Sequence, residues 1–131
     1  MDSDLHYKGY NNTPLLWTDE LFGIQQYAVT NSKVMTIKSQ NVHIRLGLLV
    51  EQFVFDCLNV NKDIKIIATN IQVIEDKKTL GELDCLIIDH KKLIHLEVAY
   101  KFYLYDPTIT GSELDKWIGP NRKDSLKQKL N

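Results

Sequence analysis

Three strand-like runs joined by two short charged turns constrain the fold of this chain more than any other feature. The runs are rich in β-branched and aromatic residues, which favour strands, and they are IKIIATNIQVI (64–74), TLGELDCLIID (79–89) and KLIHLEVAYKFYLY (92–105). The segments EDKK and DHKK that separate them have room only for tight turns. The pattern therefore predicts a meander of three consecutive antiparallel strands.

The residues before the meander have the period of an amphipathic helix. The segment NVHIRLGLLVEQFVFDCLN predicts a helix over 42–58, packed across the sheet, with Asn41 as its N-cap. At about 100° per residue, its polar stripe consists of Arg45, Gln52, Asp56 and Asn59. Glu51 falls on the apolar side, between Phe55 and Leu58, so we expect its carboxyl group to point toward the core.

The two ends of the chain surround this helix and meander. Residues 1–40 are expected to form a lead-in segment, in which TPLLWTDELFGIQQY packs against the core and Thr18 opens a short helix. A last helix is expected to begin at Gly119 and Pro120, because proline suits the first helical turn. No further strand follows it, so we expect the core at 41–131 to be incomplete at its C-terminus.

Length and composition limit the class of protein. A chain of 131 residues that is 44% hydrophobic and 25% charged resembles one soluble globular domain. It has no run of about 18 apolar residues to span a membrane and no signal peptide, so we expect a cytoplasmic protein. Cys57 and Cys85 lie inside apolar runs and are expected to be buried free thiols. A net charge of −1 predicts no broad surface for DNA or RNA, although a local basic face is compatible with it.

Two acids occupy the middle of the second and third runs, where burying a charge is costly. Counted from a turn at His90 and Lys91, Asp84 lies opposite Glu97, with Cβ atoms ~4.5–5.5 Å apart. Carboxylates this close repel one another unless a cation or a shared proton intervenes. Mg²⁺ or Mn²⁺ is the simplest such cation, because hard cations take oxygen ligands. We therefore expect Asp84 and Glu97 to be metal ligands, with Glu51 from the helix as a third.

Lys101 lies on the same predicted strand face as Glu97, two residues beyond Ala99. Its side chain is long enough to return toward the acids, where an ammonium group would stabilise developing negative charge. Metal-binding carboxylates with a nearby lysine are the groups used in metal-assisted phosphodiester hydrolysis. The sequence thus predicts a metal-dependent nuclease acting on DNA or RNA, with catalytic residues Glu51, Asp84, Glu97 and Lys101.

The helix acid, the two hairpin acids and the lysine resemble the PD-(D/E)XK nuclease superfamily. More closely, five blocks look like the bacterial domain-of-unknown-function family 1853, which is grouped with that superfamily. The blocks occur in order over 42–130 and are RLGLLVEQFVFDCL, NIQVI, TLGELDCLI, HLEVAYKFYLYD and WIGPNRKDSLKQKL. The resemblance implies an α/β, restriction-endonuclease-like core of order α-β-β-β-α-β. It also implies that Glu51 is the helix acid, Asp84 the first hairpin acid and Glu97 the motif acid.

The chain departs from that superfamily at the lysine. The D/E-x-K spacing after Glu97 leads to Ala99, so Lys101 would have to supply the positive charge. A second hypothesis is therefore a catalytically inactive nuclease-like fold that binds nucleic acid or protein, and a third is an N-terminal fragment of a larger protein. A solvated polar face, with Glu82 and Lys101 as a diagonal ion pair, would also explain the acids.

Several other polar residues have two explanations. His95 is either a strand-edge residue or a neighbour of the metal site, and Asn70 is either a polar edge residue or part of a groove. The basic residues near the C-terminus either contact phosphates or form a solvated helix face, and they are Arg122, Lys123, Lys127 and Lys129.

Overall fold

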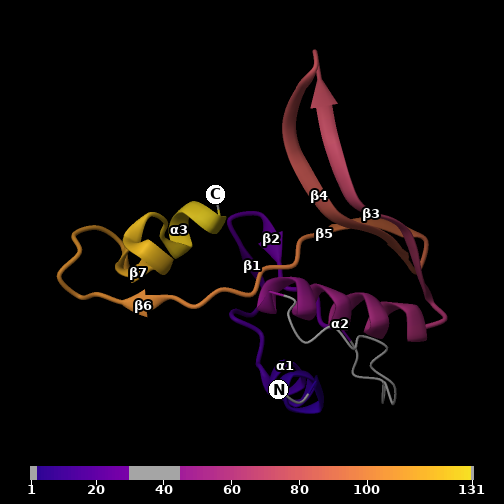
Figure 1. Ribbon diagram of the computed structural model, residues 1–131, viewed down its shortest axis with the longest axis horizontal. Coiled ribbons are helices and arrows are strands. Elements are labelled where there is room, and N and C mark those ends of the chain that lie inside the picture. Colours follow the sequence, from indigo (N-terminus) through magenta and orange to yellow (C-terminus); the bar gives the residue numbers. More distant parts are fainter. Residues whose placement is uncertain (1–2, 30–44, 131) are drawn as a thin grey trace. The chain divides into compact units, whose positions relative to one another are not determined.

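The computed structural model describes residues 3–29 and 45–130 (Figure 1). The chain divides into two compact units, residues 1–14 with 27–99 and residues 15–26 with 100–131. The sequence had predicted a different division, with a lead-in segment to residue 40 and one core after it. The units do not follow the predicted boundary at residue 40. Each unit joins a segment from the first 26 residues to a later part of the chain. The predicted N-cap Asn41 lies outside the described residues.

The first unit contains the predicted meander. Its strands pair antiparallel in the order β3-β4-β5, with bounds Ile64–Glu75, Lys78–Asp89 and Lys92–Leu96. Each turn has two residues at positive φ: Asp76 (48°) and Lys77 (64°) in the first, and His90 (46°) and Lys91 (67°) in the second. Two-residue turns of this kind match the right-handed twist of paired strands. The three-strand antiparallel meander is therefore confirmed.

The third strand is much shorter than predicted. It ends at Leu96, which pairs with Cys85, whereas the alternating pattern predicted a strand to residue 105. Beyond this point β3 and β4 continue as a long two-stranded hairpin (Figure 1). The backbone N–H of Val98 donates a hydrogen bond of 2.8 Å to the carboxylate of Asp84. The alternating pattern predicted too long a strand, because a strand also needs a neighbouring strand whose backbone groups pair with its own. Here the side chain of Asp84, rather than a backbone carbonyl, accepts the hydrogen bond from Val98.

Helix α2 (Leu46–Val60) packs against the sheet and forms the core with β4. Val54 and Leu58 lie about one helical turn apart and pack with Cys85 and Ile87, alternate residues of the strand. All four are buried. Partly buried side chains surround this core, and they are Tyr10, Tyr27, Val29, Phe55, Ile64, Ile66, Ile94, Leu96 and Val98.

The N-terminal helix α1 (Ser3–Asn12) packs on α2 in the first unit. The ring centroids of Tyr7 and Tyr10 lie 5.3 and 5.7 Å from that of Phe53. The hydroxyl of Tyr7 is 3.6 Å from Sγ of Cys57, and burial raises the pKa of Tyr7 to about 12. The start of the chain is therefore part of the first unit's packing rather than a separate lead-in. Both cysteines are buried free thiols, as predicted.

A hairpin replaces the short helix that was expected after Thr18. Strands β1 (Glu20–Leu21) and β2 (Ile24–Gln25) pair antiparallel in the second unit. Phe22 and Gly23 form the turn, with φ of 54° and 75°. Glycine adopts positive φ at no steric cost, so Gly23 favours the turn over a helix. The helix prediction was wrong because it relied on apolar spacing and ignored this glycine.

The rest of the second unit consists of short elements. They are β6 (Leu104–Tyr105), η1 (Glu113–Lys116), β7 (Trp117–Ile118), η2 (Pro120–Arg122) and α3 (Leu126–Leu130), with β6 paired to β7. The predicted last helix does begin with a turn at Pro120, but Arg122 has a positive φ of 55°, which ends it. The backbone N–H of Gly119 then bonds to the carbonyl of Asp124 at 2.8 Å. One continuous helix is therefore replaced by two short ones.

Candidate functional site

Helix α2 and strand β4 bring Glu51 and Asp84 close enough to interact electrostatically. Glu51 lies three residues before Val54 and seven before Leu58, so it shares the helix face that packs on the sheet. Burial raises the pKa of its carboxyl group, and the negative charge of Asp84 raises it further. Glu82 acts in the same direction. The charged form of Glu51 is therefore destabilised by its surroundings.

Asn70 of β3 is a polar neighbour of these acids. The register of β3 and β4 places it opposite Asp84, and its φ of 52° lies in the left-handed region, which asparagine tolerates better than most residues. A hydrogen bond from its side chain to Glu51 lowers the pKa of that carboxyl and opposes the effect of burial. The sequence left two explanations for Asn70, a polar edge residue or part of a groove, and did not place it among the site residues. The sequence feature that could have identified this position is an asparagine, a residue that is disfavoured in strands, within a run of β-branched residues.

Glu97 reaches the position opposite Asp84, one residue past the last β4–β5 pair. Its Oε1 is 2.7 Å from Nε2 of His95, and the two side chains are 45% and 42% exposed. Residues two apart lie on the same face of a strand, which explains this pair. The carboxylate of Glu97 is thus engaged by its neighbour on the chain, and His95 acts as its partner.

Lys101 does not lie on a strand with Glu97, because β5 ends at Leu96 and residues 97–103 form no strand. It belongs to the second unit, where its Nζ is 3.0 Å from Oδ2 of Asp124. The hydrogen bond to Asp124 raises the pKa of the ammonium group. The predicted continuation of one strand face from Glu97 to Lys101 was therefore wrong.

The predicted three-acid metal set is not assembled among the described side chains. Within residues 3–29 and 45–130, no group of three or more His, Cys, Asp or Glu side chains is arranged to hold a metal ion. The neighbours Glu51 and Asp84 still provide two carboxylates from different elements. Mg²⁺ is commonly bound by only one or two carboxylates together with water. The donor chemistry of this pair therefore fits Mg²⁺ or Mn²⁺, with Glu97 outside the immediate set.

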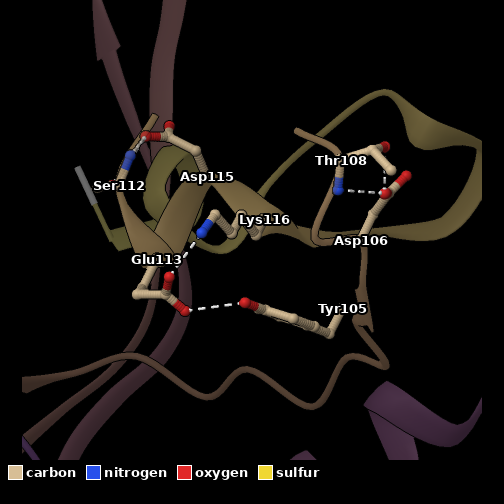
Figure 2. A network of polar contacts seen from close by, with 7 residues as sticks. All are labelled: Tyr105, Asp106, Thr108, Ser112, Glu113, Asp115 and Lys116. Carbon is tan, nitrogen blue, oxygen red and sulfur yellow. Dashed lines mark hydrogen bonds and ion pairs between the residues drawn. The ribbon is translucent and has the colours of Figure 1, made fainter. Parts of the chain in front are cut away.

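Two of the basic residues near the C-terminus, Arg122 and Lys127, form ion pairs with acids of the second unit. Nη2 of Arg122 is 2.7 Å from Asp106, and Nζ of Lys127 is 3.1 Å from Asp115. The adjoining polar network links Lys116 to Glu113 and that carboxylate to Tyr105, while Ser112 bonds to Asp115 and Thr108 to Asp106 (Figure 2). Several of these pairs join different short elements of the second unit.

A protein-family model described as Domain of unknown function (DUF1853) matches residues 23–131. The chain belongs to this family. No curated protein and no solved structure matches it. In this member of the DUF1853 family, no helix within residues 3–29 and 45–130 has the length and apolar character needed to cross a membrane.

The DUF1853 match extends over both units from the turn between β1 and β2 onward. It includes the acid pair of the first unit and Lys101 of the second. The α1 helix precedes it, although the aromatic side chains of this helix pack on α2. All four predicted site residues of this DUF1853 protein thus lie inside the family region.

Proposed function

We propose that this protein is a metal-dependent phosphodiester hydrolase, nuclease-like in fold, that acts on DNA or RNA. Support for the proposal comes from the order of helix α2 and strands β3, β4 and β5, which is the order of the first four elements in the α-β-β-β-α-β pattern that the resemblance implies. The sequence resemblance to the PD-(D/E)XK superfamily supports the same assignment. The proposal rests most directly on the acids carried by the helix and the hairpin.

The observation that carries the proposal is the interaction between Glu51 and Asp84. An acid on the core-facing side of a helix is costly, and the charge of Asp84 adds to that cost by raising the pKa of Glu51. A fold built only for stability would gain from replacing Glu51 by an uncharged residue. Functional sites are where such mutually unfavourable charges are retained. A bound divalent cation would relieve the repulsion.

Glu51 and Asp84 are the residues that would hold the ion, with Asn70 orienting the Glu51 carboxylate through its side-chain hydrogen bond. When bound, Mg²⁺ or Mn²⁺ would supply charge neutralisation at the phosphate and a water of lowered pKa. The backbone N–H of Val98 donates a hydrogen bond to Oδ2 of Asp84, which orients that carboxylate. The protein's contribution is therefore a pair of positioned carboxylates on rigid elements.

In this proposal, Glu97 and Lys101 do not belong to the pair of carboxylates that would hold the ion. Glu97 stands at the register position opposite Asp84 and would become a third ligand by leaving His95. Lys101 keeps the role that the sequence predicts for it, stabilising negative charge on the phosphate, and within the second unit its ammonium group pairs with Asp124. The side chain of Glu97 is hydrogen-bonded to His95 in the structure, so a metal ion would have to compete with this partner.

A second candidate is a nuclease-like fold that binds nucleic acid or protein without cleaving it. The specific observation that favours it is the end of β5 at Leu96, which removes the strand on which a motif lysine would stand. Ala99 occupies the usual lysine position, and Lys101 is paired within the second unit. Metal binding and cleavage together distinguish the two candidates.

The first experiment is calorimetric titration of the whole chain with Mg²⁺ or Mn²⁺. The variants are Glu51→Gln and Asp84→Asn, which keep side-chain size, and the matched control is Glu75→Gln, an exposed acid at the end of β3. We expect binding to wild type and to the control, and none to either site variant. Absence of binding to the wild type would favour the binding module.

The second experiment measures cleavage of labelled single- and double-stranded DNA and RNA with and without metal. Cleavage should require the metal and should be lost in Asp84→Asn. Cleavage by the wild type in the presence of a chelator would contradict the mechanism.

A further inference from the structure

The second unit contains an open cavity of about 450 Å³. This volume lies within the range of sites that bind small molecules or single groups of larger ligands. Its wall brings together the segment after β5, the end of β6 and the turn that follows β7. The lining residues are Phe102, Tyr103, Leu104, Asp106, Ile118, Gly119, Pro120 and Arg122.

The cavity presents apolar side chains to solvent. Phe102 and Leu104 are 70% and 73% exposed, the two highest exposed fractions among the large apolar side chains of the described residues. The ring of Tyr100 meets that of Phe102 edge-on at a centroid distance of 5.9 Å, so the Phe102 ring is supported by a neighbour. A supported and exposed aromatic ring is suited to stacking against a flat ligand.

A cation stands beside this apolar wall. The guanidinium of Arg122 contacts Asp106 through Nη2 at 2.7 Å, while the Arg122 side chain is 68% exposed. Asp106 is itself held by Thr108, which lowers the pKa of the carboxyl group together with Arg122. A guanidinium has five N–H donors, so an ion pair through one nitrogen leaves other N–H groups that can bind a second anion such as phosphate.

Tyr103 adds a polar group with unmet hydrogen-bonding capacity. Within the described part of the chain, its hydroxyl is one of two buried side-chain polar atoms that have no hydrogen-bond partner. Leaving such a group unsatisfied is unfavourable.

We propose that this cavity binds one nucleotide of a single-stranded nucleic acid, with the base against Phe102 and the phosphate on Arg122. A flat apolar surface next to an arginine matches the two halves of a nucleotide, and bases are available for stacking only when they are unpaired. The inference rests on the proposed function and specifies its substrate class as single-stranded. It concerns a binding site separate from Glu51 and Asp84.

The test is fluorescence anisotropy of the whole chain with a labelled single-stranded oligonucleotide and with its duplex, in a chelator so that no cleavage occurs. Phe102→Ala should weaken single-strand binding about tenfold or more, because stacking is lost. Phe102→Tyr should restore it. The matched control is Phe22→Ala, another exposed aromatic residue of the second unit, and it should leave binding unchanged.

The phosphate contact has its own matched pair of variants. Arg122→Gln should weaken binding and reduce the salt dependence by about one counterion, whereas Lys129→Gln on helix α3 should do neither. Circular dichroism spectra should be the same for all variants, since the changed side chains are exposed.

The outcomes separate this inference from the proposed function. Binding that depends on Phe102, with no cleavage when metal is present, supports the cavity and contradicts the hydrolase. Cleavage by the wild type with unchanged affinity in Phe102→Ala overturns the cavity alone. Absence of oligonucleotide binding by the wild type at low salt, or equal loss in Phe22→Ala, also overturns it.

Discussion

The carboxylate of Asp84 accepts a hydrogen bond of 2.8 Å from the backbone N–H of Val98, directly beyond the last residue pair of β4 and β5. This contact marks the point at which the chain leaves the sheet. It also fixes one oxygen of an acid that the sequence predicted as a metal ligand. The structural and proposed catalytic roles of Asp84 are therefore joined in one side chain.

Replacing Asp84 should separate these two roles. Asp84→Ala removes the acceptor of a charge-assisted bond and should lower the free energy of unfolding by about 1.5–3 kcal/mol. Asp84→Asn keeps an oxygen acceptor and should cost less, while losing metal binding. Urea unfolding measures both variants, with Glu75→Ala, at an exposed position at the end of β3, as the control. Equal stability of Asp84→Ala and that control would show that the Val98 contact contributes nothing.

The raised pKa of Glu51 predicts a pH-dependent stability. A carboxyl group that holds its proton more tightly in the folded chain makes no difference below its unfolded pKa and destabilises the fold as pH rises through the folded pKa. Glu51→Gln should therefore raise the melting temperature at neutral pH and change it little near about pH 4. Thermal scans across this range measure the effect. A variant that is less stable than wild type at neutral pH would contradict the assigned environment.

Two glycines should respond oppositely to alanine. A Cβ on Gly119 would lie 2.7 Å from Cγ of Asp124, so Gly119→Ala should displace that carboxyl from Lys101 and destabilise the second unit. A Cβ on Gly47 of α2 would meet nothing within 4 Å, and Gly47→Ala should stabilise the helix by roughly 0.4–1 kcal/mol. Hydrogen exchange locates each effect. Slower exchange around Gly119→Ala would disprove the predicted clash.

Leu58 tests the core between α2 and the sheet. Its side chain is fully buried, so Leu58→Ala should lower the free energy of unfolding by about 2–5 kcal/mol. Val60→Ala, at an exposed position in the last turn of the same helix, should have a much smaller effect. Denaturant titration of the two variants provides the comparison. Similar losses would mean that the helix face has been assigned incorrectly.

Lys101 should matter for cleavage and not for metal binding. If its ammonium stabilises the phosphate in the transition state, Lys101→Ala should reduce the cleavage rate by ~10²–10³ and leave metal affinity unchanged. Lys127→Ala, which breaks another ion pair of the second unit, is the matched control. Full cleavage by Lys101→Ala, or an equal loss in the control, would show that Lys101 has no specific role in cleavage.

The local pattern of the sequence determined the helix, the meander and its turns. Alternating residues between EDKK and DHKK leave little choice of register, because a one-residue shift would turn every side chain to the other face. The helical spacing of Val54 and Leu58 likewise determined which side of α2 meets the sheet, and with it the orientation of Glu51.

Only the tertiary structure decided where the third strand ends and what the charged side chains contact. Residues after Leu96 alternate as a strand does, but pairing depends on backbone partners that local pattern does not specify. The salt bridge of Lys101 with Asp124, 23 residues further along the chain, follows from that departure. Sequence spacing can place an acid on a face, but its partners depend on segments far away in the chain, because electrostatic interactions act through space.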